Sequence, residues 1–292
     1  MLFKNRNQII DNGQTERLKT IRSDILDIFS AAVEAVNPYN SVISRFENNT
    51  IKLDLAKINI SDFKNIYLIG FGKASTGMAK AVCDSVNVKE GIVITNDFTG
   101  NSFDINVKIF VAYHPVPRTE NIRATEKLLE LIQKCTKDDL LIILISGGGS
   151  ALLCKPRINL EDLQKTTGLL LRCGADIKEI NTVRKHLSHV KGGQLAALSK
   201  SKIVSFIISD VIGDPIEFIS SGPTYPDSTT YKDAMDVLLK YKIKNDVPYS
   251  VIKILENGIN NIIQENPKGD NPIFKKVDNI IVANNEISSI AA

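Results

Sequence analysis

Six consecutive apolar residues, Leu140 to Ile145, place the strongest constraint on the fold of this chain. The run has the length of a strand, and its apolar residues are consecutive rather than alternating with polar ones. A strand with this pattern is covered on both faces, as in a parallel sheet that carries helices on either side. We therefore expect this segment to lie in the middle of such a sheet.

The rest of the chain follows a β-α-β rhythm around that strand. Further strands are expected at residues 66–69, 92–94, 109–112 and 203–208, and the segments between them have helical spacing of apolar residues. An amphipathic helix is predicted over residues 18–36. The rhythm predicts an α/β fold, a three-layer, Rossmann-like parallel sheet with helices on both faces.

The predicted organisation has three parts. Residues 1–240 are expected to form the Rossmann-like domain, and residues 241–276 a helical and loop connection. Residues 277–292 read as the first strand and helix start of a second, truncated α/β domain. Asn284 follows that strand, where it is expected to cap the helix, and it is also a candidate for binding substrate or phosphate.

Composition excludes several classes of protein. The 292 residues carry a net charge of only +3, and the basic residues are scattered, so nucleic-acid binding is not expected. The four cysteines are widely spaced and contain no Cys-x-x-Cys pair, which favours buried thiols over a disulfide framework or a zinc site. The amino end does not resemble a secretory signal, and no stretch approaches a membrane span, so a cytoplasmic location without membrane contact is expected.

The first of four chemically suggestive clusters lies between residues 70 and 75, with the sequence GFGKAS. It is a strand-to-helix turn in which Gly70 and Gly72 permit close backbone approach, Lys73 adds positive charge, and Ser75 opens the helix. The cluster is not a dinucleotide fingerprint, because Ser75 replaces the last glycine, and it lacks Walker A spacing. The alternatives are an anion-binding turn and a purely structural one.

The second cluster directly follows the buried strand and contains Ser146, Gly147, Gly148, Gly149 and Ser150. Successive glycines can present several backbone amides to an oxyanion or a phosphate. A flexible glycine turn is the structural alternative. A serine-hydrolase elbow is disfavoured because a leucine replaces its second glycine.

The third cluster combines the segment NTVRKH, residues 181–186, with the segment KGG, residues 191–193. Arg184 and Lys191 could bind an anion or be ordinary surface charges. His186 and His189 are three residues apart, but further zinc ligands are not evident, and we expect both histidines to face solvent.

The fourth cluster places Asp210 and Asp214 after the strand at 203–208, where carboxylates suit Mg²⁺ binding or general-base chemistry. Turn formation and helix capping are the alternatives, above all for Asp214. His114 ends another strand and could bind a carboxylate or satisfy backbone groups. Ligands of parallel sheets lie beyond the carboxyl ends of the strands, where all these residues are expected.

Taken in order, the motifs of this chain resemble those of the glycerate 2-kinase family, whose members have also been labelled hydroxypyruvate reductases. The resemblance runs from about residue 20 to the carboxyl end and rests on GFGKAS, HPVP, LISGGGSALL, NTVRKHLSHVKGG, SDVIGD and SSGPTYPD. It implies two α/β domains with the active site between them. It also implies transfer of the γ-phosphoryl group of ATP to the 2-hydroxyl of D-glycerate with Mg²⁺, giving 2-phosphoglycerate.

The resemblance further implies roles for individual residues. Lys73 would be the catalytic lysine, and the loop 146–150 would hold an anionic group. Asp210 would be the base or a metal partner, and Arg184 and Lys191 would hold the substrate carboxylate or the nucleotide phosphates.

The chain departs from the family in length, because members of the family extend well past residue 292. We therefore expect weak or no activity unless a homodimer partner or a separate chain supplies the missing domain. Two other functions remain open, an NAD(P)H-dependent hydroxypyruvate reductase and an inactive binding module. The reductase would need an intact glycine fingerprint, although Asp97 lies near the position of a ribose ligand.

Overall fold

The computed structural model describes residues 2–97 and 104–292 and contains a parallel six-stranded sheet. The strands lie in the order β6 (Val107–Val111), β5 (Glu90–Thr95), β4 (Ile66–Phe71), β7 (Leu140–Ile145), β8 (Lys202–Ile208) and β9 (Val277–Ala283). All six residues of β7 are buried, and β7 lies between β4 and β8. The predicted α/β class and the interior position of this strand are confirmed.

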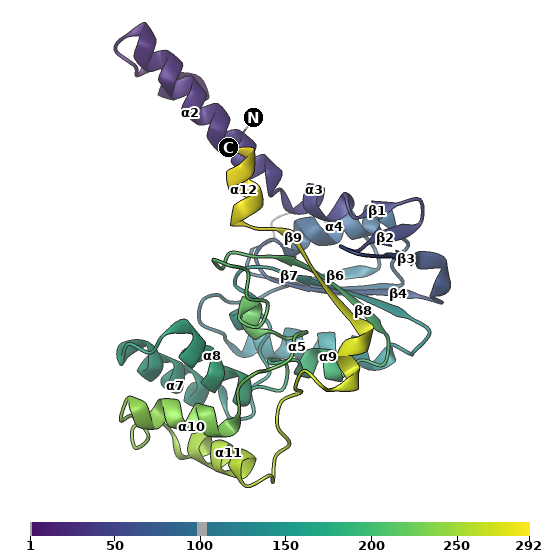
Figure 1. Cartoon of the computed structure of the whole chain (residues 1–292), viewed down its shortest axis with the longest axis vertical. Coiled ribbons are helices and arrows are strands. Elements are labelled where there is room, and N and C mark those ends of the chain that lie inside the picture. Colours follow the sequence, from purple (N-terminus) through teal and green to yellow (C-terminus); the bar gives the residue numbers. More distant parts are fainter. Residues whose placement is uncertain (1, 98–103) are drawn as a thin grey trace.

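Helices cover both faces of the sheet (Figure 1). On one face, α3 (Pro38–Ile43) and α4 (Ser75–Ser85) share a core with inward-facing strand residues such as Leu68 and Leu144. The other face packs on α5 (Thr119–Lys134), α6 (Gly149–Leu152) and α9 (Gln194–Ala197). A small antiparallel sheet, β1 (Phe46–Glu47), β2 (Thr50–Lys52) and β3 (Lys57–Asn59), followed by η1 (Ile60–Asp62), precedes β4.

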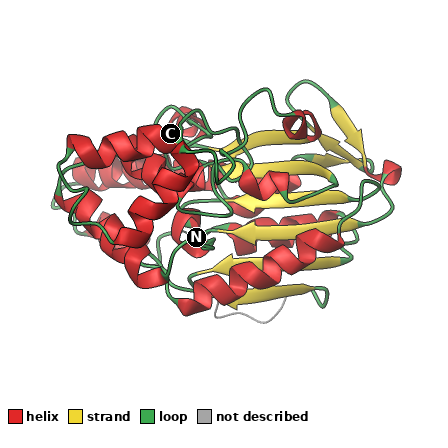
Figure 2. Ribbon diagram, turned by 90° about the horizontal axis from the view of Figure 1, so that it is seen from below, coloured by secondary structure: helices red, strands yellow, loops and turns green. Residues whose placement is uncertain are grey.

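Four helices form a lobe with a core of its own. They are α7 (Leu160–Arg172), α8 (Ile177–His186), α10 (Tyr231–Lys240) and α11 (Tyr249–Ile259). Their facing sides bury residues such as Leu170, Val183, Leu238 and Leu255. Figure 2 shows this lobe gathered at one end of the strands. Residues 241–276, expected as a connection, thus contribute α11 to the lobe and then return through η3 (Pro272–Lys276).

The strand expected to open a second domain lies in the first one. Strand β9 pairs in parallel with β8, from Ile203 opposite Val277 to Ile207 opposite Ile281. The expected boundary at residue 277 therefore falls inside a continuous sheet. The physical reason is that the lobe and η3 form the crossover connection that a parallel neighbour of β8 requires. Sequence periodicity alone cannot tell which sheet a buried strand joins.

The amino-terminal helix α2 (Glu16–Ala35) confirms the amphipathic helix predicted over residues 18–36. It begins at Thr15, whose side chain accepts a hydrogen bond from the Leu18 amide, as is typical of an N-cap. It projects from the sheet and contacts α1 (Arg6–Asp11) and the final helix α12 (Asn285–Ala291) (Figure 1). Among the helices in the described ranges, none is both long and apolar enough to cross a membrane.

Candidate active site

A cavity of about 490 Å³ lies between the strand ends and the helical lobe. From the strand side it is lined by His114, Gly147, Gly148, Ser150 and Asp210. Helices α7 and α8 form the opposite wall, where Arg184 is the one basic residue among the lining residues. The structure thus brings together residues from three of the four clusters, as the carboxyl-end position of these loops predicts.

The loop Ser146–Ser150 joins β7 to the short helix α6 and is fastened to the turn after β4. The Lys73 amide donates to the Gly147 carbonyl at 2.9 Å, and the Ala74 amide donates to the Ser146 hydroxyl at 3.1 Å. Gly148 has φ +85°, in the left-handed region that glycine adopts without strain. The first and second clusters therefore form one structural unit.

Three chemically active side chains pack directly on this glycine loop. A Cβ atom at position 147 would lie 2.4 Å from Asp210 Oδ2, and one at position 148 would lie 3.0 Å from the His114 ring and 3.4 Å from Lys73 Cε. The side chains of Lys73, His114 and Asp210 thus converge on consecutive glycines. A side chain at position 147 would displace Asp210, and one at position 148 would press on the His114 ring, whereas Lys73 lies at ordinary van der Waals distance.

Burial and the neighbouring charges change the pKa of His114. Burial lowers the pKa of His114, nearby Lys73 lowers it further, and Asp210 opposes them with a smaller effect. His114 is therefore neutral at neutral pH and can donate a hydrogen bond from one ring nitrogen and accept one at the other. Lys73 and Asp210 are both exposed, and Asp210 lines the cavity.

Arg184 and Lys191 converge on the other side of the same loop. Arg184 Nη2 donates to the Ser150 carbonyl at 3.1 Å, and Lys191 Nζ donates to the carbonyls of Ser150 (2.8 Å) and Leu153 (3.1 Å). Burial lowers the pKa of Lys191 to about 7, and Arg184 adds to this effect. Within the described ranges neither cation forms an ion pair, so this region is short of negative charge. Only Arg184 lines the cavity.

A turn that contains two strained serines is hydrogen-bonded to the glycine loop. Ser220 and Ser221, in η2 (Ile219–Ser221), have φ values of 51° and 65°. The Ser220 hydroxyl donates to the Ser146 carbonyl at 3.2 Å, and the Ser221 hydroxyl lies 2.8 Å from the Ser150 hydroxyl. Left-handed non-glycine residues cost free energy and persist where surrounding contacts fix them. The sequence marks this segment as an unusual loop but cannot reveal its backbone conformation.

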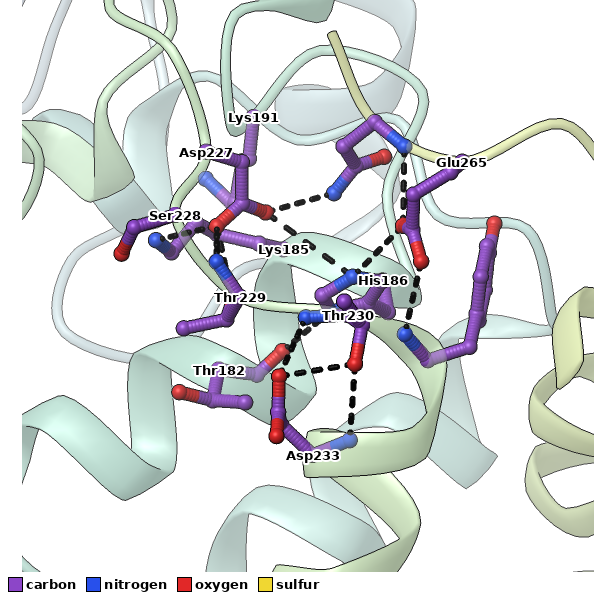
Figure 3. Close-up of polar contacts among 12 residues, drawn as sticks. Thr182, Lys185, His186, Lys191, Asp227, Ser228, Thr229, Thr230, Asp233 and Glu265 are labelled. Atoms are coloured by element: carbon purple, nitrogen blue, oxygen red, sulfur yellow. Dashed lines mark hydrogen bonds and ion pairs between the residues drawn. The ribbon is translucent and has the colours of Figure 1, made fainter. Parts of the chain in front are cut away.

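A buried ion network lies beside the loop that carries this serine turn, and Figure 3 shows the part of it around Asp227, His186 and Glu265. Lys185 is fully buried, and its Nζ lies 2.7 Å from Glu217 Oε1 and 2.8 Å from Asp227 Oδ1. His186 is also buried, with Nε2 3.0 Å from Glu265 Oε1. The expectation that His186 faces solvent is therefore wrong, whereas His189 is exposed as predicted. The cationic sequence cluster lies inside the protein and not on a solvated face.

Several candidate residues shape the surroundings without lining the cavity. Gly70 lies within β4, and Ser75 is fully buried, with its hydroxyl donating to the Gly72 carbonyl at 2.7 Å. Asp214 accepts a hydrogen bond from the Asn284 side-chain amide, and Asn284 caps α12 through the Ile287 amide. The lining residues also exclude Gly72, Lys73, Ser146, Gly149 and Lys191, although Lys73 lies beside Gly148. Of the two candidate metal carboxylates, only Asp210 faces the cavity.

A metal site built from protein side chains alone is not found in the part of the chain that the structure describes. Searched over residues 2–97 and 104–292, the structure has no group of three or more His, Cys, Asp or Glu residues that could hold a metal ion. Mg²⁺ does not require such a group, because it commonly uses one or two carboxylates together with water and substrate phosphates. Asp210, exposed at the cavity, fits that mode of binding.

Sequence reasoning did not find the apolar wall of the cavity. It is formed by side chains of α7, α8 and the loop before η2, namely Leu163, Leu171, Ile177, Ile180 and Phe218. Leu171 and Ile177 remain 63% and 61% exposed although they belong to amphipathic helices. In the sequence these residues resemble ordinary core positions, so no local signal distinguished them.

Comparison with known proteins identifies the family. Residues 24–256 match the model of a family described as a domain of unknown function, DUF4147. The chain belongs to this family. The predicted resemblance to glycerate 2-kinases is also confirmed, because relatives with that name align over most of the chain.

A glycerate 2-kinase from Pyrococcus horikoshii is 40% identical over 270 residues, which cover 92% of this chain and 60% of that protein. A solved structure of a Pyrococcus horikoshii protein superposes with a TM-score of 0.84 and 40% identity, covering 93% of this chain and 62% of that one. The structure of a glycerate kinase from Thermotoga maritima has a TM-score of 0.77 and 34% identity, over 91% of this chain and 60% of that one. The chain thus spans about 60% of the length of these relatives.

Proposed function

We propose that this chain carries the phosphoryl-transfer site of a glycerate 2-kinase, which moves the γ-phosphoryl group of ATP to the 2-hydroxyl of D-glycerate. The main support is the convergence of Lys73, His114 and Asp210 on the glycine loop at the edge of one cavity. The names of the relatives point to the same reaction. The product of this reaction is 2-phosphoglycerate.

The site has the groups that phosphoryl transfer requires. Such reactions depend on charge neutralisation and on in-line positioning more than on covalent chemistry. Lys73 can approach the transferring phosphoryl group, because its side chain is exposed and its Cε lies beside Gly148. Charge of this kind, held in place before the reaction, stabilises the transition state without rearrangement.

Asp210 is the proposed general base. The 2-hydroxyl oxygen of glycerate attacks the γ-phosphorus, its proton passes to the Asp210 carboxylate, and the bond to the β-phosphate oxygen breaks to release ADP. His114, neutral and adjacent, can orient the hydroxyl through a hydrogen bond. Asp210 would help to hold Mg²⁺, which would neutralise charge on the phosphates.

Arg184 is the proposed ligand of the substrate carboxylate, because it lines the cavity and forms no ion pair in the described ranges. Guanidinium groups bind carboxylates through two parallel hydrogen bonds. Lys191 is placed to act indirectly, since its amino group is held by the carbonyls of Ser150 and Leu153.

A hydroxypyruvate reductase is less well supported. The turn at residues 70–75 lacks the third glycine of a dinucleotide fingerprint, and the Ser75 side chain that replaces it is buried and bonded to Gly72. Ligand binding without turnover is the other alternative, and it predicts neither phosphoglycerate nor oxidised NADH.

The test compares alanine substitutions of two nearby lysines. Purified protein is incubated with D-glycerate, ATP and Mg²⁺, and phosphoglycerate and ADP are quantified for wild type, Lys73→Ala and Lys80→Ala. Lys80 is an exposed lysine of α4 that pairs with Asp84, so it controls for loss of a surface charge. We expect transfer to fall by about 100-fold or more in Lys73→Ala only. Equal activity in all three proteins would remove Lys73 from the mechanism, and oxidation of NADH with hydroxypyruvate would favour the reductase.

A further inference from the structure

The cavity extends well beyond the groups assigned to phosphoryl transfer. His114, Gly147, Gly148 and Asp210 line the cavity from the strand ends, and Arg184 lines it from α8. Its apolar residues come from α7, the start of α8 and the segment Pro115–Pro117, and they form an apolar end. Glycerate is a three-carbon acid that carries a carboxylate and two hydroxyls, so it has little apolar surface to bury. The apolar end therefore suits a different ligand, because the free energy of binding becomes more favourable when a ligand removes apolar side chains from water.

The exposure of the side chains supports this conclusion. Val116, Leu171 and Ile177 line the cavity and are 54%, 63% and 61% exposed. They come from three different segments but face one space. Ligand sites commonly combine an apolar wall with a few polar groups that fix orientation.

Gly168 gives this end of the cavity a flat surface. It lies within α7 and lines the cavity, although glycine inside a helix costs about 0.5–1 kcal/mol relative to alanine. A Cβ atom there would meet nothing closer than the tip of the Arg172 side chain, at 3.4 Å. Packing within the protein therefore does not require a glycine here. Because Gly168 has no side chain, its half-buried helix backbone allows close approach by a planar group.

One polar group borders the apolar surface. Gln164 donates from Nε2 to the Pro117 carbonyl at 2.7 Å, which orients its side-chain amide at the cavity wall. Its Oε1 accepts no hydrogen bond in the parts of the chain described, so it can accept one from a ligand amino group. A nucleobase is flat and largely apolar, and hydrogen-bonding groups lie along its edge. It therefore matches this surface.

We propose that the apolar end of the cavity, formed by Val116, Gly168, Leu171 and Ile177, binds the nucleobase of the phosphoryl donor. The base lies on the backbone at Gly168, and the phosphate chain extends toward the glycine loop and Lys73. This inference rests on the proposed kinase function but identifies a separate part of the site. A purine with an exocyclic amino group, such as adenine, fits the acceptor on Gln164.

The test measures binding of ATP, adenosine and inorganic triphosphate by calorimetry in the presence of Mg²⁺. Two variants alter the apolar end. Gly168→Leu fills it with a side chain that the helix tolerates, and Leu171→Ser removes apolar contact. Leu239→Ser is the matched control, because Leu239 is a similarly exposed helix leucine, at 51%, that does not line the cavity.

We expect wild type and Leu239→Ser to bind ATP more tightly than triphosphate and to bind adenosine detectably. In Gly168→Leu and Leu171→Ser, affinity for ATP and adenosine should fall by about tenfold or more, with triphosphate unchanged. Equal affinity of wild type for ATP and triphosphate, or unchanged ATP binding in both cavity variants, would overturn the nucleobase assignment and leave the kinase proposal standing. Failure of wild type to bind either phosphate compound would count against both.

Discussion

Replacing Lys185 with methionine removes the charge that balances two buried carboxylates. The Lys185 amino group is fully buried and contacts Glu217 and Asp227 at 2.7 and 2.8 Å. Asp227 is completely buried, and Glu217 is 17% exposed at the side chain. Methionine keeps a similar volume, so the variant tests the charge and not the packing.

The expected loss of stability is large. Removing one partner of a buried ion pair costs about 3–5 kcal/mol, because the other charge stays buried and uncompensated. For a chain of this size, each 1 kcal/mol lowers the melting temperature by about 2–4 °C, so a decrease of about 6–20 °C is expected. Lys240→Met is the control. It breaks a more exposed pair with Glu179, for which about 1 kcal/mol or less is expected.

The pH dependence of the unfolding free energy gives a more specific test. Burial raises the pKa of Asp227, but Lys185 and His186 outweigh this effect, and the pKa of Asp227 lies below its ordinary value. The same balance of burial against Lys185 and Ser228 lowers the pKa of Glu217. A carboxylate with a lowered pKa stabilises the fold above its unfolded pKa, near 4, and loses that contribution as pH falls through the folded value.

In Lys185→Met the carboxylates can protonate at low pH and escape the penalty. The difference in unfolding free energy between wild type and variant should therefore be largest near pH 7 and shrink toward pH 4. Denaturant titrations at several pH values measure it directly. A difference that is below 1 kcal/mol at pH 7, or that grows on acidification, would refute the assigned role of this network.

Three further predictions concern the glycine loop and its neighbours. The pKa of His114 should lie below its ordinary 6.5, and Lys73→Ala should raise it, because Lys73 helps to lower it. NMR of the ring protons measures this pKa. An unchanged pKa in the variant would show that Lys73 does not affect His114. Gly147→Ala should reduce phosphoryl transfer by about tenfold or more at an almost unchanged melting temperature, since the new Cβ would lie 2.4 Å from Asp210 Oδ2; full activity would contradict the contact. Because the folded pKa of Lys191 is about 7 against 10.5 unfolded, its proton is lost on folding in this range and stability should rise with pH between these values. Lys191→Met should flatten that rise in urea titrations, and an identical slope would contradict the shift.

The sheet could be predicted from the sequence because its signals are local. The unbroken apolar run Leu140–Ile145 indicated an interior strand, and the glycine, histidine and aspartate clusters indicated strand ends. The place of β9 could not be predicted, because pairing with β8 depends on a crossover through the helical lobe. Contacts between elements that are far apart in the sequence cannot be inferred from local patterns, even where each element is recognised.

The candidate site was predicted in part. Lys73, His114, Gly147 and Asp210 follow strands that share one edge, so their proximity follows from the topology. Burial of the cation cluster was not predicted, because the sequence around Lys185 gives no sign of Glu217 and Asp227, which are 32 and 42 residues away. The left-handed serine turn and the apolar wall likewise depend on tertiary contacts.

Identification of the product tests most directly whether this chain forms a phosphoryl-transfer site for glycerate. Phosphorus NMR of a reaction with D-glycerate, ATP and Mg²⁺ distinguishes 2-phosphoglycerate from 3-phosphoglycerate. We predict 2-phosphoglycerate, formed together with ADP and lost in Lys73→Ala. Formation of 3-phosphoglycerate would contradict the proposed position of transfer, and binding of both substrates without any product would contradict the assignment of this chain as a kinase.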